Sequence, residues 1–250
     1  MNVLILGGNG YLGPHVVKAL AGEHRLRVTD IKPPPPEIKE EFGDQHEFFD
    51  VDATSSSQVM QAAQGTDAIV NLSVVRQHPR VAFDVNVLGC LNTMQAAVEH
   101  GIRRVINTGP HFTVTGPTYE GFDHGIVPDV PPHSGTNLYA ISKSLGQEVC
   151  RAFTADHDIY VMDFLFYNMR FVSQLKRGAG GVPFVIAWPD AGEVFRLGLA
   201  VDLAKLPSRC EVFFMHGDNP QGKFLLDKTK RILGFEPKED VSVLWRKTRG

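Results

Sequence analysis

The chain of 250 residues is 43% hydrophobic and 21% charged, a composition typical of a globular protein large enough to bury a sizeable core. Its formal net charge of -3 gives no basic footprint for nucleic acid and no polybasic patch for a membrane. Neither a signal-like segment nor an apolar run of membrane-spanning length is recognised. We therefore expect a small-molecule partner, and no nucleic-acid or membrane partner.

The cysteines and histidines indicate the cellular location and whether the protein binds a metal. The three cysteines, Cys90, Cys150 and Cys210, are odd in number and lie in apolar or helical segments. We interpret them as buried thiols and therefore expect a reducing, cytoplasmic location. The ten histidines show no His-Glu-x-x-His spacing, and no Cys-x-x-Cys pair occurs, so we expect no metal site.

A glycine-rich turn follows the first predicted strand, residues 2–6, which is a continuous apolar run typical of a strand buried on both faces. The spacing Gly7-x-x-Gly10-x-x-Gly13 leads into a predicted helix over residues 14–20. In this context glycines let the backbone approach a pyrophosphate, and the helix N-terminus presents free N–H groups to it. The turn is predicted to bind a dinucleotide through Gly7, Asn9, Gly10, Tyr11, Leu12 and Gly13.

The second predicted strand, residues 26–30, ends in an acidic residue, Asp30. A carboxylate about 20 residues beyond the glycine turn accepts hydrogen bonds from the adenosine ribose hydroxyls and repels a 2′-phosphate. Asp30 therefore favours NAD as the cofactor, with an exposed strand-end acid as the alternative interpretation. The prolines at 33–36 are expected to form a stiff surface loop.

Strands and helices continue to alternate along the chain. Further strands are predicted over 47–52, 67–72, 104–108, 159–165 and 211–215, and helices over 56–64, 84–100, 188–199 and 224–233. This α/β pattern predicts a Rossmann-like doubly wound parallel sheet with helices on both faces and ligands at the carboxyl ends of its strands. We expect residues 1–168 to form the NAD-binding domain and residues 169–250 to form a small substrate lobe packed on it as one structural unit.

Tyr139 and Lys143 lie four residues apart in a predicted helix, and therefore on one face of it. A phenol ionises near pH 10, and a neighbouring cation favours its charged form, so Tyr139 is a candidate proton acceptor closer to neutrality. The spacing alone is weak evidence. Because the Tyr139 and Lys143 pair follows a glycine turn in the same chain, it indicates the catalytic half of a dinucleotide site.

Six motifs in chain order resemble the extended short-chain dehydrogenase/reductases, also called the NAD-dependent epimerase/dehydratase family. They are Gly7-x-x-Gly10-x-x-Gly13, Asp52, Asn71-Leu72-Ser73-Val74, Asn86-Val87-x-Gly89-x-x-Asn92, Tyr139-x-x-x-Lys143 and Phe166-Tyr167-Asn168. The likeness covers roughly residues 1–170. It implies that Tyr139 is the catalytic acid/base, and that Lys143 lowers the pKa of that phenol and holds the nicotinamide ribose.

The same resemblance implies further cofactor contacts. Asp52 and Ala53 are expected to contact the adenine. Contacts with the ribose and nicotinamide are expected for Leu72, Ser73 and Thr108, and Tyr167 and Asn168 are expected near the nicotinamide amide. The resemblance also implies a homodimer, with the helices around residues 84–100 and 139–155 as its expected interface.

The end of the fifth strand departs from the family, which places a serine or threonine there opposite the tyrosine. Alignment forward from the strand puts Gly109 or Pro110 at this position, whereas alignment back from the following loop puts His111 there. Thr113 lies 26 residues before Tyr139, close to the usual separation. We therefore prefer Thr113 to His111 as the third catalytic residue.

A second departure is size, because only 107 residues follow Lys143. Family members that hold nucleotide sugars generally carry a larger C-terminal lobe, so we expect a small substrate. The segments 128–131 and 234–238 resemble the short uronate dehydrogenases of this family. Candidate binders of substrate carboxylate or hydroxyl groups are Arg76, His78, His111 and Arg170.

The sequence therefore predicts an NAD-dependent oxidoreductase that transfers a hydride between a secondary hydroxyl of a sugar or sugar acid and NAD, with Tyr139 as acid/base. One alternative is an NAD-dependent sugar or nucleotide-sugar epimerase or dehydratase, in which the hydride returns to the substrate. Another is a non-catalytic NAD-binding regulator. The missing serine favours the regulator, and the intact Tyr139 and Lys143 oppose it.

Overall fold

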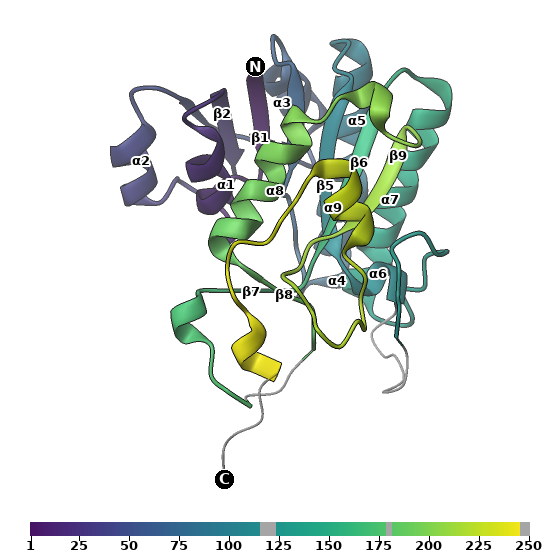
Figure 1. Ribbon diagram of the computed structural model, residues 1–250. Helices are drawn as coiled ribbons and strands as arrows, with labels where there is room; N and C mark the ends of the chain where they lie inside the picture. Colours follow the sequence, from purple (N-terminus) through teal and green to yellow (C-terminus); the bar gives the residue numbers. More distant parts are fainter. Residues whose placement is uncertain (116–123, 179–181, 246–250) are drawn as a thin grey trace.

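Seven parallel strands form one sheet within residues 1–115, 124–178 and 182–245, the part of the chain that the computed structural model describes (Figure 1). In spatial order they are β3 (Glu47–Asp50), β2 (Arg25–Asp30), β1 (Asn2–Leu6), β4 (Ala68–Asn71), β5 (Arg104–Pro110), β6 (Tyr160–Phe166) and β9 (Cys210–Phe214). The chain builds outward in opposite directions from the neighbouring strands β1 and β4. The predicted doubly wound sheet is confirmed, and ligands of such sheets bind where the order reverses.

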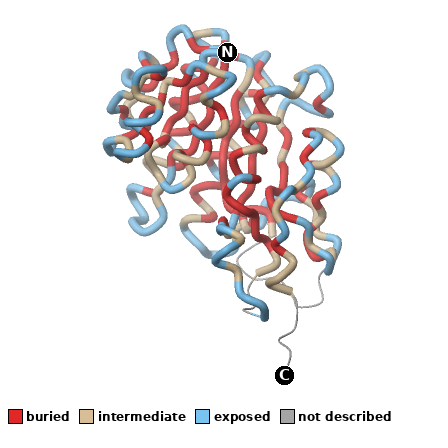
Figure 2. Tube along the Cα trace, turned by 60° about the vertical axis from the view of Figure 1, so that its left-hand side comes forward, coloured by how far each residue is buried: buried red, intermediate tan, exposed pale blue. Residues whose placement is uncertain are grey.

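Helices cover both faces of the sheet and bury both. One face carries α1 (Gly13–Leu20), α2 (Pro36–Phe42) and α8 (Trp188–Ala200), and the other carries α3 (Ser56–Ala63), α5 (Gly89–Glu99) and α7 (Leu138–Asp156). Along β1, Val3 and Ile5 join the first core, whereas Leu4 and Leu6 join the second. Figure 2 shows the buried strands running through the middle of the molecule. Burial on both faces explains why the strands are continuous apolar runs.

The helical stretch before β5 begins earlier than the sequence predicted. It comprises α4 (Pro79–Phe83), a π-helical turn (Asp84–Leu88) and α5, whereas the pattern predicted a helix over 84–100. Pro79 is at the first helical position, where a missing N–H costs nothing. By length and composition alone the stretch Pro79–Glu99 would also suit a membrane span, and 50% of its most apolar part is buried inside the fold.

The loop predicted for the prolines at 33–36 ends earlier than expected. An unpredicted helix, α2, begins at Pro36, with Pro35 as its N-cap. The cause is the same as at Pro79. Proline breaks the interior of a helix but suits its first turn, since φ is already set near the helical value.

Residues after 168 contribute to the central fold as well as to the rim of the sheet. β9 pairs in parallel with β6, and α8 lies beside α1 (Figure 1). The remaining elements are a two-stranded sheet of β7 (Asn168–Arg170) and β8 (Val185–Ala187), the helices α6 (Phe112–Thr115) and α9 (Asp227–Leu233), and the 3-10 turns Val172–Gln174, Leu203–Lys205 and Ser242–Trp245. The sheet is therefore completed by the C-terminal segment.

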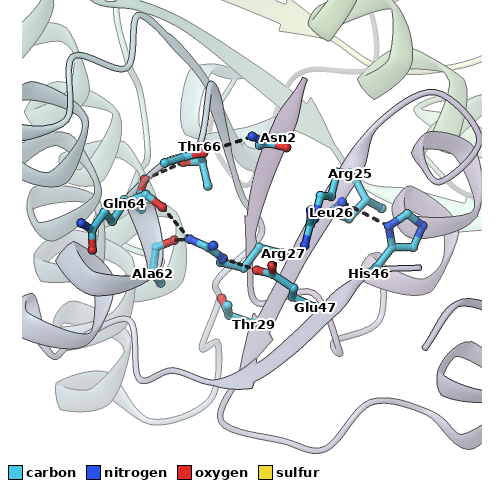
Figure 3. A network of polar contacts seen from close by, with 12 residues as sticks. Asn2, Arg25, Leu26, Arg27, Thr29, His46, Glu47, Ala62, Gln64 and Thr66 are labelled. Carbon is cyan, nitrogen blue, oxygen red and sulfur yellow. Dashed lines mark hydrogen bonds and ion pairs between the residues drawn. The ribbon is translucent and has the colours of Figure 1, made fainter. Parts of the chain in front are cut away.

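A polar network ties the amino ends of the strands together (Figure 3). Arg27 Nε lies 2.7 Å from Glu47 Oε2, and its NH1 donates to the carbonyls of Ala62 and Gln64. Because Arg27 is on β2, Glu47 on β3 and Ala62 on α3, a single guanidinium joins three elements. The carboxyl ends of the strands open onto a cavity.

Phe195→Ala tests whether α8 is part of the central core. The Phe195 ring is fully buried, with its centroid 5.4 Å from that of Phe164 and 5.8 Å from that of Phe166, both on β6. We expect the variant to lower the free energy of unfolding by about 3–5 kcal/mol in urea titrations followed by circular dichroism. The matched variant Phe49→Ala, at a ring that is 48% exposed, should cost about 1 kcal/mol or less. Equal losses would contradict this assignment.

Candidate active site

A cavity of about 550 Å³ lies at the carboxyl ends of β1, β2, β4, β5 and β6. Its size is typical of a site for a small ligand or cofactor. The predicted site residues that line it are Gly7, Gly10, Tyr11, Leu12, Asp30, Asp52, Ala53, Leu72, Ser73, Arg76, Thr108, Tyr139, Lys143, Tyr167, Asn168 and Arg170. The fold thus brings together both halves of the site that the sequence proposed.

The glycine turn between β1 and α1 has no room for a side chain at Gly7 or Gly13. Gly7 has a φ of 74°, and a Cβ on it would lie 2.7 Å from the Ser73 nitrogen. A Cβ on Gly13 would lie 1.8 Å from the Gly8 oxygen. The turn is therefore pressed against its neighbours, and the N-cap of α1 has no side-chain hydrogen bond. Such a glycine cradle at a helix N-terminus suits a pyrophosphate.

Two predicted members of the turn shape it without lining the cavity. The Asn9 backbone nitrogen donates to Asp30 Oδ2 at 3.1 Å, and its Nδ2 donates to the Lys32 carbonyl at 2.7 Å. Gly13 lets α1 approach Gly8 closely. Both residues fix the first turn against the end of β2.

Asp30 lies at the carboxyl end of β2 with its carboxylate held in place. Oδ2 accepts the Asn9 N–H and Oδ1 accepts the Lys32 N–H, each at 3.1 Å. A carboxylate has about four acceptor positions, so both oxygens retain capacity for further hydrogen bonds. Asp52, at the end of β3, instead accepts from the Thr54 nitrogen and hydroxyl and remains exposed on the rim.

Tyr139 and Lys143 reach the cavity from the first turns of α7. The Asn137 side chain caps this helix by accepting the Ala140 N–H at 3.1 Å. The Lys143 ammonium is 1% exposed, and its Nζ donates to the Ser73 carbonyl at 2.8 Å. Burial lowers the pKa of Lys143, and Cys90 and Asp163 oppose that change.

The phenol of Tyr139 has a cationic neighbour, Arg76, which the sequence predicted only as a substrate binder. Burial raises the pKa of Tyr139, and the Arg76 guanidinium opposes this rise. The Arg76 Cζ lies 5.6 Å from the centroid of the Tyr139 ring. Arg76 and Lys143 thus line the same cavity as the phenol.

The structure does not bring Thr113 to the cavity. β5 extends through Pro110 and not only to residue 108, so Gly109 and Pro110 line the wall, and Thr113 falls inside α6. Thr113 is fully buried, and its hydroxyl donates to the Pro110 carbonyl at 3.1 Å. The side chain facing Tyr139 here is Phe112, whose ring centroid lies 5.9 Å from that of the tyrosine.

His111 and His78 also lie away from the cavity lining. His111 is 2% exposed and stacks on Phe184, with ring centroids 4.6 Å apart. Burial, together with His216, lowers the pKa of His111 to about 3, so its imidazole is neutral near pH 7. The exposed His78 is the N-cap of α4, and its Nδ1 accepts the Val81 N–H. Arg76 and Arg170 are the predicted substrate binders that line the cavity.

Sequence reasoning missed a set of buried polar residues beneath Lys143. Asp163 lies within β6, is 1% exposed and accepts a hydrogen bond from Asn107. The available signal was its position inside an apolar strand, because a charged residue is expensive to bury and therefore usually has a partner.

Comparisons with known proteins identify similar chains. A family model described as the NAD dependent epimerase/dehydratase family matches residues 3–169. The NAD-dependent glucose-6-phosphate dehydrogenase of Haloferax volcanii is 24% identical, over 95% of this chain and 93% of that protein, and the uronate dehydrogenase of Pseudomonas syringae is 27% identical, over 59% and 52%. A solved mutant of Agrobacterium tumefaciens uronate dehydrogenase with NAD has a TM-score of 0.80 at 20% identity, over 100% of this chain and 90% of that one.

His111→Phe tests the burial of a neutral imidazole beside the cavity. Because the pKa of His111 is about 3 when folded and near 6.5 when unfolded, its contribution to stability is complete above pH 6.5 and is lost as the pH falls toward 3. Between pH 7 and pH 4.5 the unfolding free energy of the variant should therefore fall by about 2.5 kcal/mol less than that of the wild type. Urea titrations at the two pH values measure this, and parallel losses in both proteins would refute it.

Proposed function

Because the chain belongs to the NAD-dependent epimerase/dehydratase family, we propose that it is an NAD-dependent dehydrogenase acting on a hydroxyl of a small anionic sugar, with Tyr139 as the acid/base. The observation that carries this proposal is the shared cavity. Tyr139 and Lys143 line the same cavity as the glycine turn and Asp30, which come from the opposite half of the sequence. A module that only binds a cofactor has no need of a phenol beside two cations.

The residues present fit NAD. In this proposal Gly7, Gly10 and the N-terminus of α1 hold the pyrophosphate, and Asp30 holds the adenosine ribose. Lys143 uses one of its three donors on Ser73, which leaves two for the nicotinamide ribose. When bound, NAD supplies the hydride acceptor.

Tyr139 performs the proton transfer in this proposal. Its phenolate accepts the proton of the substrate hydroxyl while the hydride leaves the carbon that bears this hydroxyl. Burial opposes ionisation of the phenol, and Arg76 favours it. In this proposal Lys143, which lines the same cavity, adds a second positive charge. Thr113 is not part of the proposal, since its hydroxyl is occupied by Pro110 and does not line the cavity.

The substrate's anionic group is assigned to Arg170, with Arg76 nearer the phenol. Guanidinium groups bind carboxylates and phosphates through paired, charge-assisted hydrogen bonds. Arg170 lines the cavity, and within the described part of the chain its side chain donates to the adjacent Met169 carbonyl. The named relatives act on a uronate or on glucose 6-phosphate, and both substrates carry such an anion.

Tyr139→Phe tests the acid/base role. NADH formation, followed by absorbance with uronates and sugar phosphates, should fall about 10²–10⁴-fold, while NAD affinity measured by calorimetry stays within a few-fold. The control Tyr160→Phe removes a hydroxyl at the amino end of β6, outside the cavity, and should keep full activity. Unchanged turnover in Tyr139→Phe would refute the catalytic role. Isomerised product without NADH release by the wild type would assign an epimerase instead.

Arg170→Gln tests the nature of the substrate. Loss of one charge-assisted pair, about 1.5–3 kcal/mol, should raise KM for an anionic sugar about 10- to 100-fold and change KM for the neutral parent sugar far less. Arg103→Gln, at the exposed Asp158 ion pair, is the matched control and should change neither KM. An equal effect of Arg170→Gln on both sugars would exclude Arg170 as the anion binder.

A further inference from the structure

Three polar side chains lie opposite one another on neighbouring strands of the sheet. Asn71 of β4 is the register partner of Asn107 of β5, and Asn107 is the register partner of Asp163 of β6. Register partners in parallel strands point to the same face, which here is the face covered by α5 and α7. All three residues are 1–2% exposed, so they form a polar row inside an apolar layer.

Hydrogen bonds connect this row to the backbone of Ser73, and the backbone of Ser73 to Lys143. Asn107 Nδ2 donates to Asp163 Oδ1 at 2.7 Å, and Asn71 Nδ2 donates to Asn107 Oδ1 at 3.1 Å. The Ser73 backbone nitrogen then donates to Asn71 Oδ1 at 3.1 Å. The Ser73 carbonyl in turn accepts from Lys143 Nζ at 2.8 Å. We call these five residues the relay.

The order of donors in the relay is set at Asp163. An ionised carboxylate accepts hydrogen bonds but donates none, so Asn107 must turn its Nδ2 toward β6 and its Oδ1 toward β4. Asn71 is then oriented in the same way, and its Oδ1 faces the Ser73 nitrogen. Without the carboxylate, either amide can flip, and Ser73 loses the acceptor that fixes its backbone.

Asp163 also acts on Lys143 through its charge. The titratable and charged groups that face Lys143 are Cys90 on α5, Cys150 on α7, Asp163 on β6 and Arg76 after β4. Those around Asp163 are Lys143 and Glu148 on α7, the three thiols of Cys90, Cys150 and Cys210, and the amide of Asn107. Asp163 is the one carboxylate in the group facing Lys143, so it is the counter-charge of the buried ammonium.

We propose that Asp163 is a positioning residue for the hydride-transfer reaction: through Asn107 and Asn71 it holds the Ser73 carbonyl against Lys143, and its charge keeps Lys143 protonated. The inference rests on the proposed function, since Lys143 must be a cation to assist Tyr139 and to hold the nicotinamide ribose. Asp163 itself touches neither the cavity nor a reacting atom.

A purely structural aspartate would leave the titration of Lys143 unchanged. Burial raises the pKa of Asp163 to about 6, so the side chain is ionised at pH 8 and compensates the charge of the buried Lys143 ammonium. Removal of one member of a buried ion pair is destabilising, so Asp163→Asn should lower the free energy of unfolding at pH 8. The titration of Lys143 and the pH profile of the reaction, which a purely structural role would not move, therefore separate positioning from folding.

The test compares Asp163→Asn with Asp190→Asn in the full chain. Asp190 is the matched control because it is 2% exposed, burial also raises its pKa, and it accepts the Lys238 and Glu239 N–H groups on the opposite face of the sheet. Lysine side chains labelled at Cε are titrated by NMR, with Lys143 assigned through Lys143→Met. The pH profile of NADH formation is recorded in parallel.

In Asp163→Asn we expect Lys143 to deprotonate about one pH unit lower than in the wild type. The falling, basic limb of the kcat profile should move by the same amount, so that kcat falls by up to about tenfold at pH values above the wild-type limb while the sugar KM stays within a few-fold. Asp190→Asn should change neither curve. If Asp163→Asn does not fold, the similarly sized Asp163→Leu takes its place with the same expected shift.

The proposal is overturned if Lys143 titrates at the wild-type pH in the Asp163 variant, or if Asp190→Asn produces an equal shift. These outcomes are distinct from failure of the proposed function. If no anionic sugar supports NADH formation by the wild-type protein, the assigned reaction is wrong. The lysine titration still decides whether Asp163 controls the protonation of Lys143.

Discussion

A fully buried ammonium requires an acceptor for its protons and a compensating charge, and much of the site is arranged around this requirement of Lys143. An uncompensated ion in a protein interior costs several kcal/mol. The Ser73 carbonyl supplies the acceptor, and the Ser73 N–H donates to the row of Asn71, Asn107 and Asp163, which ends in a carboxylate. The π-helical turn serves the same region, since Asn86 donates to both the Val75 carbonyl and the Ser142 hydroxyl at 2.9 Å.

Features that depend on local pattern could be predicted from the sequence. Both faces of each central strand are buried, so the apolar runs are unmistakable, and the glycine spacing at residues 7, 10 and 13 follows from steric contact. The pairing of Tyr139 with Lys143 follows from helix geometry alone. These signals lie within a few residues of one another, which is why they locate the cofactor half of the cavity.

The residues that could not be predicted depend on strand lengths and on contacts across strands. β5 is two residues longer than its apolar pattern, and this extension carries Gly109 and Pro110 into the cavity wall and places Thr113 in α6. Asp163 meets Asn107 only through the register of β5 with β6, 56 residues apart in sequence. β7 and β8 have three residues each, too few for any periodicity to be recognised.

The placement of β9 and α8 affects how this enzyme can be recombined with its relatives. β9 is the outer strand beside β6, and α8 covers the same apolar face as α1. A chimera joined at residue 168 would exchange the strand on the β9 side of β6 and the helix on which the rings of Phe164 and Phe166 pack. A poor fit of the exchanged strand would leave β6 paired only with β5, and such an open sheet edge invites aggregation. Substrate preference is therefore transferable between relatives only as grafts into the loops at the cavity rim, with residues 188–214 kept from the recipient.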